Sequence, residues 1–356
     1  MPANFASDNV APAAPPVMAA LAAANSGPAM PYGNDAWSER LLARLASVFE
    51  RAPAEISVFP VATGTAANAL ALSLLSPPWG AIYCHPDSHA QVDECGAPEF
   101  WTGGAKLVSV DGVHGRIDPA ALDAAIAAAT PHGVHNAQPA ALTITQASEA
   151  GTVYTPDRVA ALAAVARRHG LGLHMDGARF ANAVASLGCA PADVTWRAGV
   201  DVLSLGATKG GAMAAEAVVL FRPERAAEAG FRRKRAGHLW SKARFLAAQL
   251  DGWLADGAWL ALARDANAHA AALAAGLAAL PGARLVHPCE ANEVFAELPA
   301  TLATALSGAG HLFYPVGPAA GGRAVIRLVT AWSTTVAEVE GFLADAARLA
   351  AGSAAA

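Results

Sequence analysis

Short apolar runs recur between residues 56 and 221, and longer stretches with apolar positions at helical spacing separate most of them. Seven of these runs are predicted to form strands, at residues 56–60, 81–84, 106–110, 141–145, 171–175, 200–205 and 217–221. Helices are predicted at residues 37–51, 66–75, 119–129 and 156–169. Because strands and helices alternate, we expect an α/β fold with a mostly parallel, seven-stranded sheet covered by helices.

The pattern changes near residue 256. An alanine-rich stretch predicts a long helix to about Leu280, and strands are then predicted at residues 284–287, 293–297, 312–315 and 324–329, before a last helix at 336–350. This order indicates a smaller α+β unit. We therefore expect four segments: an N-terminal arm at 1–35 with one short helix near 16–25, a large α/β domain at 36–255, a small α+β domain at 256–350 and a disordered tail at 351–356.

Composition excludes several classes of protein. Hydrophobic residues make up 54% of the chain, but much of this is alanine, and we find no apolar run long enough to cross a bilayer. The net charge is −5, so nucleic acid is not an expected partner. No lysine or arginine precedes Arg40, so the chain lacks the basic start of a signal peptide. The four cysteines form no CxxC pair, which is typical of reduced thiols in the cytoplasm.

The chemistry centres on residues 171–211. Asp176 follows one predicted strand and Lys209 follows the next, in a turn with two glycines. In α/β proteins, functional groups gather where strands end. A lysine can form a Schiff base with pyridoxal phosphate, and a carboxylate can keep its pyridine nitrogen protonated. These two residues therefore suggest a pyridoxal-phosphate site, although DGARF would also suit an ordinary helix N-cap.

Residues 84–95, CHPDSHAQVDEC, allow a different interpretation. The histidines His85 and His89 lie near two cysteines and several acids, so a metal site is an alternative. Pro86 lies between the histidines and would break the helix needed to align them. A hydrogen-bonded loop histidine is the simpler interpretation of His85.

Several motifs together resemble the threonine aldolases of the β-eliminating lyase group, in the aspartate-aminotransferase-like fold (fold type I). In chain order these are FASDN, YGND, GTAAN, SHAQVDECGAPEF, TITQASEAGTVY, HMDGARF with a downstream Thr-Lys, and RLVTAW. The resemblance covers nearly the whole chain. It implies pyridoxal 5'-phosphate as cofactor, and no metal.

The resemblance assigns roles residue by residue. It implies that His89 stacks on the pyridine ring, that Asp176 contacts its nitrogen and that Lys209 is the Schiff-base lysine. It implies cofactor contacts, chiefly to the phosphate, for Gly64, Thr65, Thr208, Lys234 and Lys242, the last two in part across a subunit interface. From local sequence alone, GTAAN could be an ordinary helix N-terminus and residues 231–245 a solvated helix face.

The substrate is expected to bind through its carboxylate. The resemblance gives that role to Arg179, Arg327 and Ser7, and adds Tyr32 as a substrate contact. A guanidinium binds a carboxylate by two parallel hydrogen bonds. Without the resemblance, these side chains would be assigned to surface ion pairs, a strand edge and turn packing.

One motif departs from the family pattern. The family commonly has E-N-T-H-N where this chain has Gln146, Ala147, Ser148 and Glu149, so the histidine thought to contact the substrate hydroxyl is missing. Glu149 could replace it as acid or base if it is buried, because burial raises a carboxylate pKa. A solvated loop acid is the alternative. Glu94 lies where the family carries an acid.

The expected function is cleavage of L-threonine, L-allo-threonine or related β-hydroxy-α-amino acids, including phenylserine, to glycine and an aldehyde. The base that takes the hydroxyl proton is left open among His89, Glu149 and a water molecule. The alternatives are a β-eliminating lyase or aminotransferase of the same fold, a metal-dependent hydrolase using residues 84–95, and an inactive binding protein. The resemblance also implies a cytoplasmic homotetramer with sites at a dimer interface.

Overall fold

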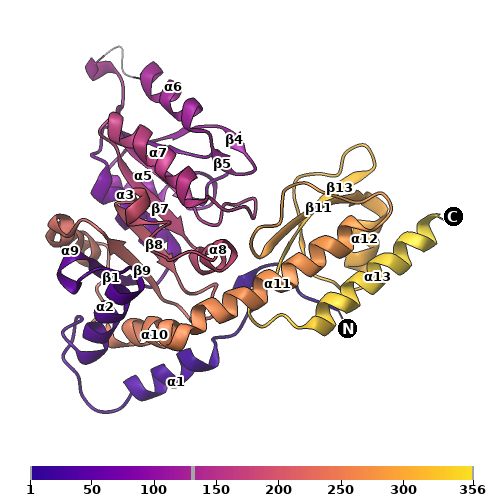
Figure 1. Cartoon of the computed structure of the whole chain (residues 1–356), viewed down its shortest axis with the longest axis horizontal. Coiled ribbons are helices and arrows are strands. Elements are labelled where there is room, and N and C mark those ends of the chain that lie inside the picture. Colours follow the sequence, from indigo (N-terminus) through magenta and orange to yellow (C-terminus); the bar gives the residue numbers. More distant parts are fainter. Residues whose placement is uncertain (1, 130–132, 355–356) are drawn as a thin grey trace.

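A seven-stranded sheet forms the centre of the larger part of the molecule (Figure 1). The computed structural model describes residues 2–129 and 133–354. The strand order is β1 (Ser57–Val61), β9 (Glu216–Leu220), β8 (Val202–Gly206), β7 (Gly172–Gly177), β6 (Gln138–Thr145), β2 (Gly80–Cys84) and β3 (Lys106–Ser109). All neighbours are parallel except that β9 is antiparallel to both β1 and β8. These are the seven strands predicted from the sequence.

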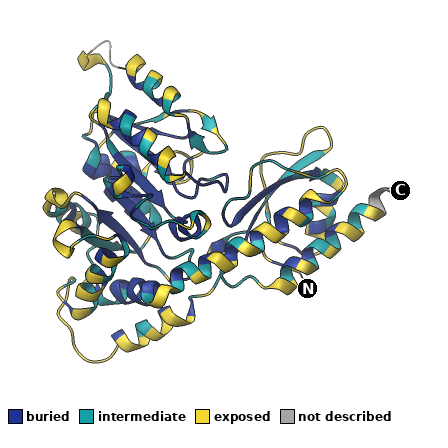
Figure 2. Cartoon of the chain, in the orientation of Figure 1, coloured by how far each residue is buried: buried dark blue, intermediate teal, exposed yellow. Residues whose placement is uncertain are grey.

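Helices cover both faces of this sheet, because its strands are apolar on both sides. Adjacent residues show this directly: Val218 packs into one hydrophobic cluster and Val219 into another on the opposite face. The helices around this sheet are α1 (Pro15–Ala24), α2 (Ala36–Val48), α3 (Gly64–Leu75), α4 (His89–Val92), α5 (Ala97–Thr102), α6 (Pro119–Ala129), α7 (Pro156–Arg168), α8 (Phe180–Leu187), α9 (Ala226–Arg235) and α10 (Arg244–Leu254). Figure 2 shows their buried sides turned toward the strands.

Local sequence explains where several helices begin. Asp35 caps α2, and its Oδ1 accepts hydrogen bonds from the backbone N–H groups of Trp37 and Ser38. Thr155 caps α7, which starts with a proline at its first position. Short 3-10 turns also occur: η1 (Asp8–Val10), η2 (Pro53–Glu55), η3 (Gly133–His135), η4 (Trp196–Ala198), η5 (Pro223–Arg225) and η6 (Ala255–Gly257).

The C-terminal part has its own antiparallel sheet and hydrophobic cluster. The strand order is β10 (Arg284–Leu285), β11 (Glu293–Pro299), β13 (Arg323–Val329) and β12 (Tyr314–Pro315). The helices here are α11 (Ala258–Ala278), α12 (Ala300–Gly308) and α13 (Val336–Ala354). Helix α11 follows α10 after a break at η6, where Asp256 has φ 52°, and it packs against both α8 and β11.

The N-terminal arm crosses from this small sheet to the large one. Phe5 is buried in the C-terminal cluster, where its ring meets Phe342 edge to face, and its backbone N–H donates to the carbonyl of Leu312. Helix α1 then packs against α10. The arm is therefore fixed by contacts at both of its ends.

Some expectations need correction. Residues 231–245 do not form one helix face, because α9 ends at Arg235 and α10 begins at Arg244. The short hairpin of β4 (Gly112–Val113) and β5 (Arg116–Ile117) and the helix α12 were not predicted. Helix α13 extends to Ala354, so it includes most of the predicted tail at 351–356. Residues 355 and 356 lie outside the described part.

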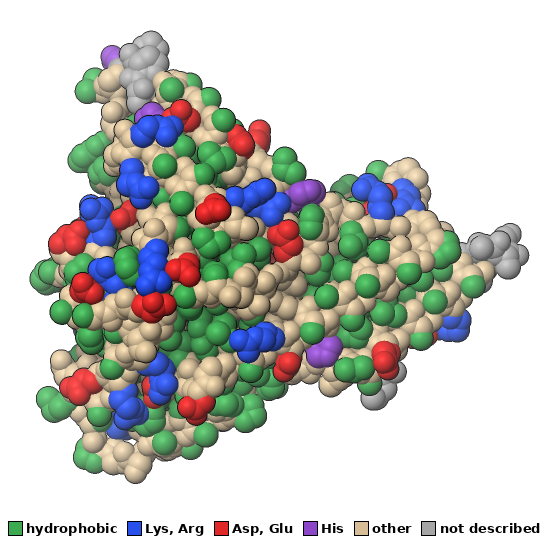
Figure 3. Space-filling view, viewed as in Figure 1, with side chains coloured by type: hydrophobic (Ala, Val, Ile, Leu, Met, Phe, Trp, Pro, Cys, Tyr) green, Lys and Arg blue, Asp and Glu red, His purple; other side chains and the backbone are tan. Residues whose placement is uncertain are grey.

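The surface carries charges of both signs. On the face drawn in Figure 3, basic and acidic side chains alternate over the larger part of the molecule. Within the described residues, none of the helices combines the length and apolar character that a membrane crossing requires.

Candidate active site

A cavity of about 380 Å³ lies at the carboxyl ends of β7 and β8. These strands are parallel neighbours, with Asp176 of β7 opposite Ser204 of β8, so Asp176 and Lys209 lie at the same edge of the sheet. The cavity is lined by both of them and by other predicted site residues: Gly64, Thr65, His89, Glu94, Glu149 and Thr208. The sequence therefore identified much of the cavity wall.

Asp176 is buried and held by two hydrogen bonds. Its Oδ2 accepts from the side-chain amide of Asn68 at 2.8 Å, and its Oδ1 accepts from the backbone N–H of Ala178 at 3.0 Å. Asn68 comes from α3, whose first turn also lines the cavity. The carboxylate therefore has a fixed orientation at the cavity wall.

A chain of hydrogen bonds links Asp176 to His89. The Asn68 amide nitrogen also donates to Oε1 of Glu94 at 2.8 Å, and the same oxygen lies 2.9 Å from Nδ1 of His89. The hydrogen bond to Glu94 raises the pKa of His89, and burial raises the pKa of Glu94. Asn68 is a site residue that we did not anticipate; only its position in GTAAN signalled it. His89 keeps Nε2 available.

The first turn of α3 can bind an anion. Thr63 is the N-cap, and its hydroxyl accepts from the N–H of Ala66 at 3.2 Å. A Cβ built on Gly64 would meet no described atom within 4 Å, so the space above this backbone is open. Helix N-termini attract phosphates through free N–H groups and the helix dipole. Thr208, predicted to join this site, accepts from the N–H of Ala215 at 3.2 Å.

Glu216 fixes the turn that carries Lys209. Its Oε2 accepts from the N–H of Ala207 at 2.8 Å, and burial raises the pKa of this carboxyl to about 7. The glycines after the lysine are required by packing, because a Cβ on Gly210 would lie 3.0 Å from the Trp253 ring. Glu216 was not identified from the sequence, since it begins an apolar strand and belongs to none of the recognised motifs.

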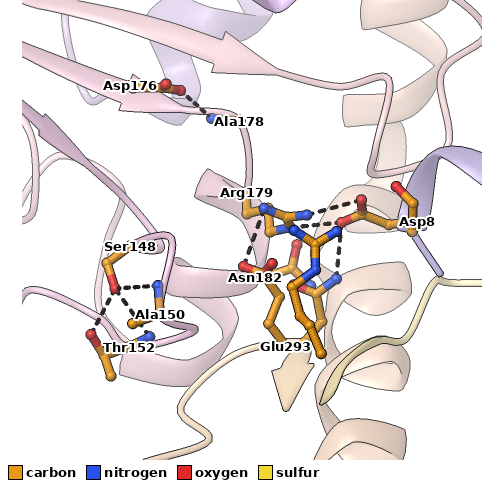
Figure 4. Close-up of polar contacts among 12 residues, drawn as sticks. Asp8, Ser148, Ala150, Thr152, Asp176, Ala178, Arg179, Asn182 and Glu293 are labelled. Carbon is orange, nitrogen blue, oxygen red and sulfur yellow. Dashed lines mark hydrogen bonds and ion pairs between the residues drawn. The ribbon is translucent and has the colours of Figure 1, made fainter. Parts of the chain in front are cut away.

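Arg179 makes ion pairs with two buried carboxylates (Figure 4). Its Nε and Nη2 donate to the two oxygens of Asp8, at 2.7 and 3.1 Å. Its Nη1 lies 3.1 Å from Oε2 of Glu293 on β11. Burial opposes ionisation of Asp8, but the charges of Arg179 and Lys209 outweigh it and lower the pKa of this carboxyl.

Ser7 and Arg327 lie at the same junction of the arm and the small sheet. The Arg327 guanidinium donates from Nη2 to the carbonyl of Ala6 at 3.3 Å, and its Nε is buried without a hydrogen-bond partner among the described residues. Ser7 accepts from the N–H of Asn9 at 3.1 Å. The charges of Arg179 and Arg327 both act on Glu293, so the two predicted carboxylate-binding arginines face one region.

Glu149 is carried into the cavity by a tightly bonded loop. The Ser148 hydroxyl accepts from the backbone N–H groups of Ala150 and Thr152 and lies 2.8 Å from the Thr152 hydroxyl (Figure 4). Glu149 is half-buried at the cavity wall rather than solvated, and burial raises the pKa of its carboxyl.

Six predicted residues are not among those that line this cavity. Ser7, Arg179 and Arg327 lie at the junction of the arm and the small sheet, and the other three, Tyr32, Lys234 and Lys242, lie elsewhere. Tyr32 is exposed, and the ammonium of Lys234 lies 5.1 Å from the centre of its ring. Both lie beside α2 and α9, and Tyr32 lines a separate cavity there. Lys242 is exposed just before α10.

The metal alternative for residues 84–95 finds no supporting geometry. His85 lies 3.2 Å from the carbonyl of Gly112, whereas His89 contacts Glu94. Among residues 2–129 and 133–354, no group of three or more His, Cys, Asp or Glu is placed to hold a metal ion. His85 and His89 therefore contact different residues.

The donor set fits pyridoxal phosphate. It combines a lysine, an oriented carboxylate, an imidazole and an open helix N-terminus around one cavity. Comparison with known proteins adds an independent finding: the family model of the beta-eliminating lyases matches residues 4–301. The chain belongs to this family.

Individual members and solved structures agree with that membership. The low specificity L-threonine aldolase of a Pseudomonas species is 41% identical over 96% of both chains. The structure of Leishmania major threonine aldolase covers 98% of this chain and 100% of its own, with 29% identity and a TM-score of 0.92. The Oryza sativa TDC, solved with PLP and tryptamine, shares the fold: identity is 14%, the TM-score is 0.75, and 98% of this chain and 83% of that one are covered.

Proposed function

We propose that this beta-eliminating lyase family member is a pyridoxal-phosphate enzyme that cleaves L-threonine, L-allo-threonine and related β-hydroxy-α-amino acids to glycine and an aldehyde. The observation that carries the proposal is the cavity in which Lys209, Asp176, His89 and the first turn of α3 meet. The 41% identity to a low specificity L-threonine aldolase favours this reaction over β-elimination or transamination, the other chemistries considered for the fold.

Each group around the cavity has a role in holding the cofactor. Lys209 would hold it covalently, Gly64, Thr65 and Thr208 would bind its phosphate, and His89 would lie against its ring. Asp176, held by Asn68 and the Ala178 N–H, would keep a proton on the ring nitrogen. When bound, the cofactor supplies an electron sink for the bond cleaved at the substrate Cα.

The substrate carboxylate would bind to Arg179 and Arg327, with Ser7 beside them. Anchoring this group fixes rotation about Cα, and therefore which bond is aligned for cleavage. Both guanidiniums act at the region where the N-terminal arm meets β11 and β13. The amino group would then point to the cavity that holds Lys209.

We assign removal of the β-hydroxyl proton to Glu149. Burial raises the pKa of this carboxyl, so its ionised form is a stronger base than an ordinary carboxylate. The hydrogen bond to Glu94 raises the pKa of His89, so its imidazole is cationic over a wider pH range and is better suited to donate or relay a proton.

We also infer a cytoplasmic homotetramer whose sites lie at a dimer interface. Tyr32 and Lys234 contact each other away from the chain's own cavity, so if they contribute to a site, that site belongs to a neighbouring subunit.

The four cysteines, Cys84, Cys95, Cys189 and Cys289, are free thiols. We retain a domain boundary at 255/256, where α10 and α11 are separated by η6.

The test is spectroscopic and then chemical. Protein supplied with pyridoxal phosphate should show a visible absorption band that borohydride removes, with the reduced label on Lys209. Incubation with L-threonine should then release glycine and acetaldehyde in equal amounts. 2-Oxobutanoate and ammonia would instead indicate a β-lyase, and a supplied protein without such a band would refute the assignment of the whole site.

A further inference from the structure

Glu293 is a buried carboxylate at the place proposed for the substrate carboxylate. It begins β11 and is 1% exposed. Its Oε2 lies 3.1 Å from Nη1 of Arg179. Glu293 pairs across the sheet with Val329, so Arg327, two residues before Val329 on β13, is its diagonal neighbour on the same face. Glu293 therefore lies beside both arginines.

Arg179 holds its two carboxylate partners differently. Asp8 receives two hydrogen bonds from the guanidinium and a third, at 3.1 Å, from the side-chain amide of Asn292. The contact with Glu293 lacks hydrogen-bond geometry, and both Glu293 oxygens are buried without a hydrogen-bond partner among the described residues. A buried carboxylate without hydrogen bonds is costly, so Glu293 is the partner that can leave.

The surroundings of Glu293 favour its neutral form. Burial raises its pKa to about 7; Arg179 and Arg327 oppose this, while Glu149 and Asp8 add to it. Cys289, which precedes β11, also interacts with it, and burial together with the charge of Glu293 raises the pKa of this thiol. Helices α11 and α12 pack on β11 through apolar side chains. The charged groups that act on Glu293 come from η1, the loop after β6, the residue that caps α8, and β13.

Binding of an amino acid would crowd this region with negative charge. Asp8, Glu293 and the substrate carboxylate would all face two guanidiniums, and Glu149 lies nearby. A guanidinium presents five N–H donors, and Asp8 already takes one edge of Arg179. The edge at Nη1 is the one that an incoming carboxylate needs, and Glu293 occupies it.

We propose that Glu293 takes the place of the substrate carboxylate on Arg179 in the free enzyme, and that substrate binding displaces it with uptake of one proton from solvent. The inference rests on the proposed function, because it needs an amino-acid carboxylate at Arg179. The bound state then holds protonated Glu293, with Asp8 and the substrate as the two carboxylates on the arginine. Substrate affinity therefore depends on pH through a residue that touches no reacting atom.

The test measures glycine binding to the holoenzyme between pH 6 and 9. Wild type is compared with Glu293→Gln and with Glu297→Gln, a matched control on the same strand whose carboxylate pairs with Arg323 and Arg284 instead. At pH 6 we expect equal dissociation constants. At pH 8 we expect the wild-type and Glu297→Gln values to be about tenfold above that of Glu293→Gln, because one proton is linked to binding.

Proton uptake is read independently by calorimetry in buffers of different ionisation enthalpy. At pH 8, wild type should take up close to one proton more per glycine than Glu293→Gln. Protons that accompany reaction of the amine, or titration of Glu149 and Glu216, are common to both proteins and cancel in this difference.

Three outcomes would overturn the inference. If Glu293→Gln follows the wild-type pH dependence and proton count while Arg179→Gln abolishes glycine binding, the displacement is wrong but the carboxylate site stands. If Glu293→Gln weakens binding equally at every pH, Glu293 is only structural. If Arg179→Gln binds glycine normally, the proposed substrate site itself fails. Should Glu293→Gln not fold, proton uptake by wild type is measured with 3-hydroxybutanoate, which lacks the amine. Uptake of close to one proton supports the displacement, and no uptake contradicts it.

Discussion

Two carboxyls at this site, Glu149 and Glu216, show how position decides the use of one chemical group. Burial raises the pKa of both. Glu216 accepts from the backbone of the lysine turn, so it fixes structure. Glu149 lines the cavity on a loop held by Ser148 and Thr152, which leaves its carboxylate directed at the space for the substrate. The same ionisable group therefore orders the backbone in one place and faces reactants in the other.

The first prediction at this scale concerns Glu149→Gln. An amide cannot accept the hydroxyl proton as a base, so we expect kcat for L-threonine to fall about 10²- to 10⁴-fold with cofactor binding unchanged. In wild type, activity should fall as pH drops and Glu149 gains its proton, and this limb should lie above the range of an ordinary carboxyl because burial raises the pKa. The measurement is the pH profile of kcat. His89→Asn is measured for comparison. If the fall of kcat at low pH disappears in His89→Asn but persists in Glu149→Gln, His89 is the base.

At the scale of elements, short continuous apolar runs identified all seven strands of the large sheet, because buried parallel strands are apolar on both faces. It failed at the hairpin of β4 and β5, whose two-residue strands are too short to show a period. Asp176 was found because it lies at the end of such a strand, and Lys209 because it follows one. Glu216 and Glu293 begin strands outside any recognised motif, and Asn68 lies in a helix, so their contacts across the fold are what show their roles.

A second prediction concerns the N-terminal arm, which acts as an element although it has little regular structure. Phe5→Ala removes a fully buried ring packed on Phe342. Large-to-small changes of this kind cost about 3–5 kcal/mol. We expect a lower midpoint in urea unfolding and, because Ser7 and Asp8 follow directly, a raised KM for L-threonine. Val10→Ala, at an exposed position on the same arm, should change neither. If Phe5→Ala is destabilised but its KM for L-threonine is unchanged, packing of the arm contributes to stability and not to substrate binding.

At the scale of the whole molecule, the site assembles parts that are distant in the chain. The arm, the turn after β7 and the strands β11 and β13 all meet at Arg179. In the proposed homotetramer, the exposed pair of Tyr32 and Lys234 would extend this arrangement beyond one chain, since neither residue lines the cavity of its own chain.

The prediction at this scale is subunit complementation. Lys209→Ala should be inactive, and Lys234→Ala should bind cofactor weakly if it serves a neighbouring site. Refolding the two variants together should restore activity to about a quarter of wild type, because random pairing gives each mixed dimer one intact site. Activity of the mixture is compared with that of each variant refolded alone. Absence of recovery, with mixed oligomers demonstrated by mass, would place each site within a single chain.

The docking of the arm has a consequence for synthesis of the protein. The N–H of Ala3 donates to the ring of His311, 308 residues later, and Phe5 bonds to Leu312. Ala3 and Phe5 are therefore synthesised about 300 residues before their partners His311 and Leu312. The ion pair of Asp8 with Arg179 belongs to the same docked arm, so it depends on the same late contacts. A tag fused directly before residue 1 would lie within a few residues of the proposed substrate pocket, so a tag placed after residue 356 is expected to disturb it less.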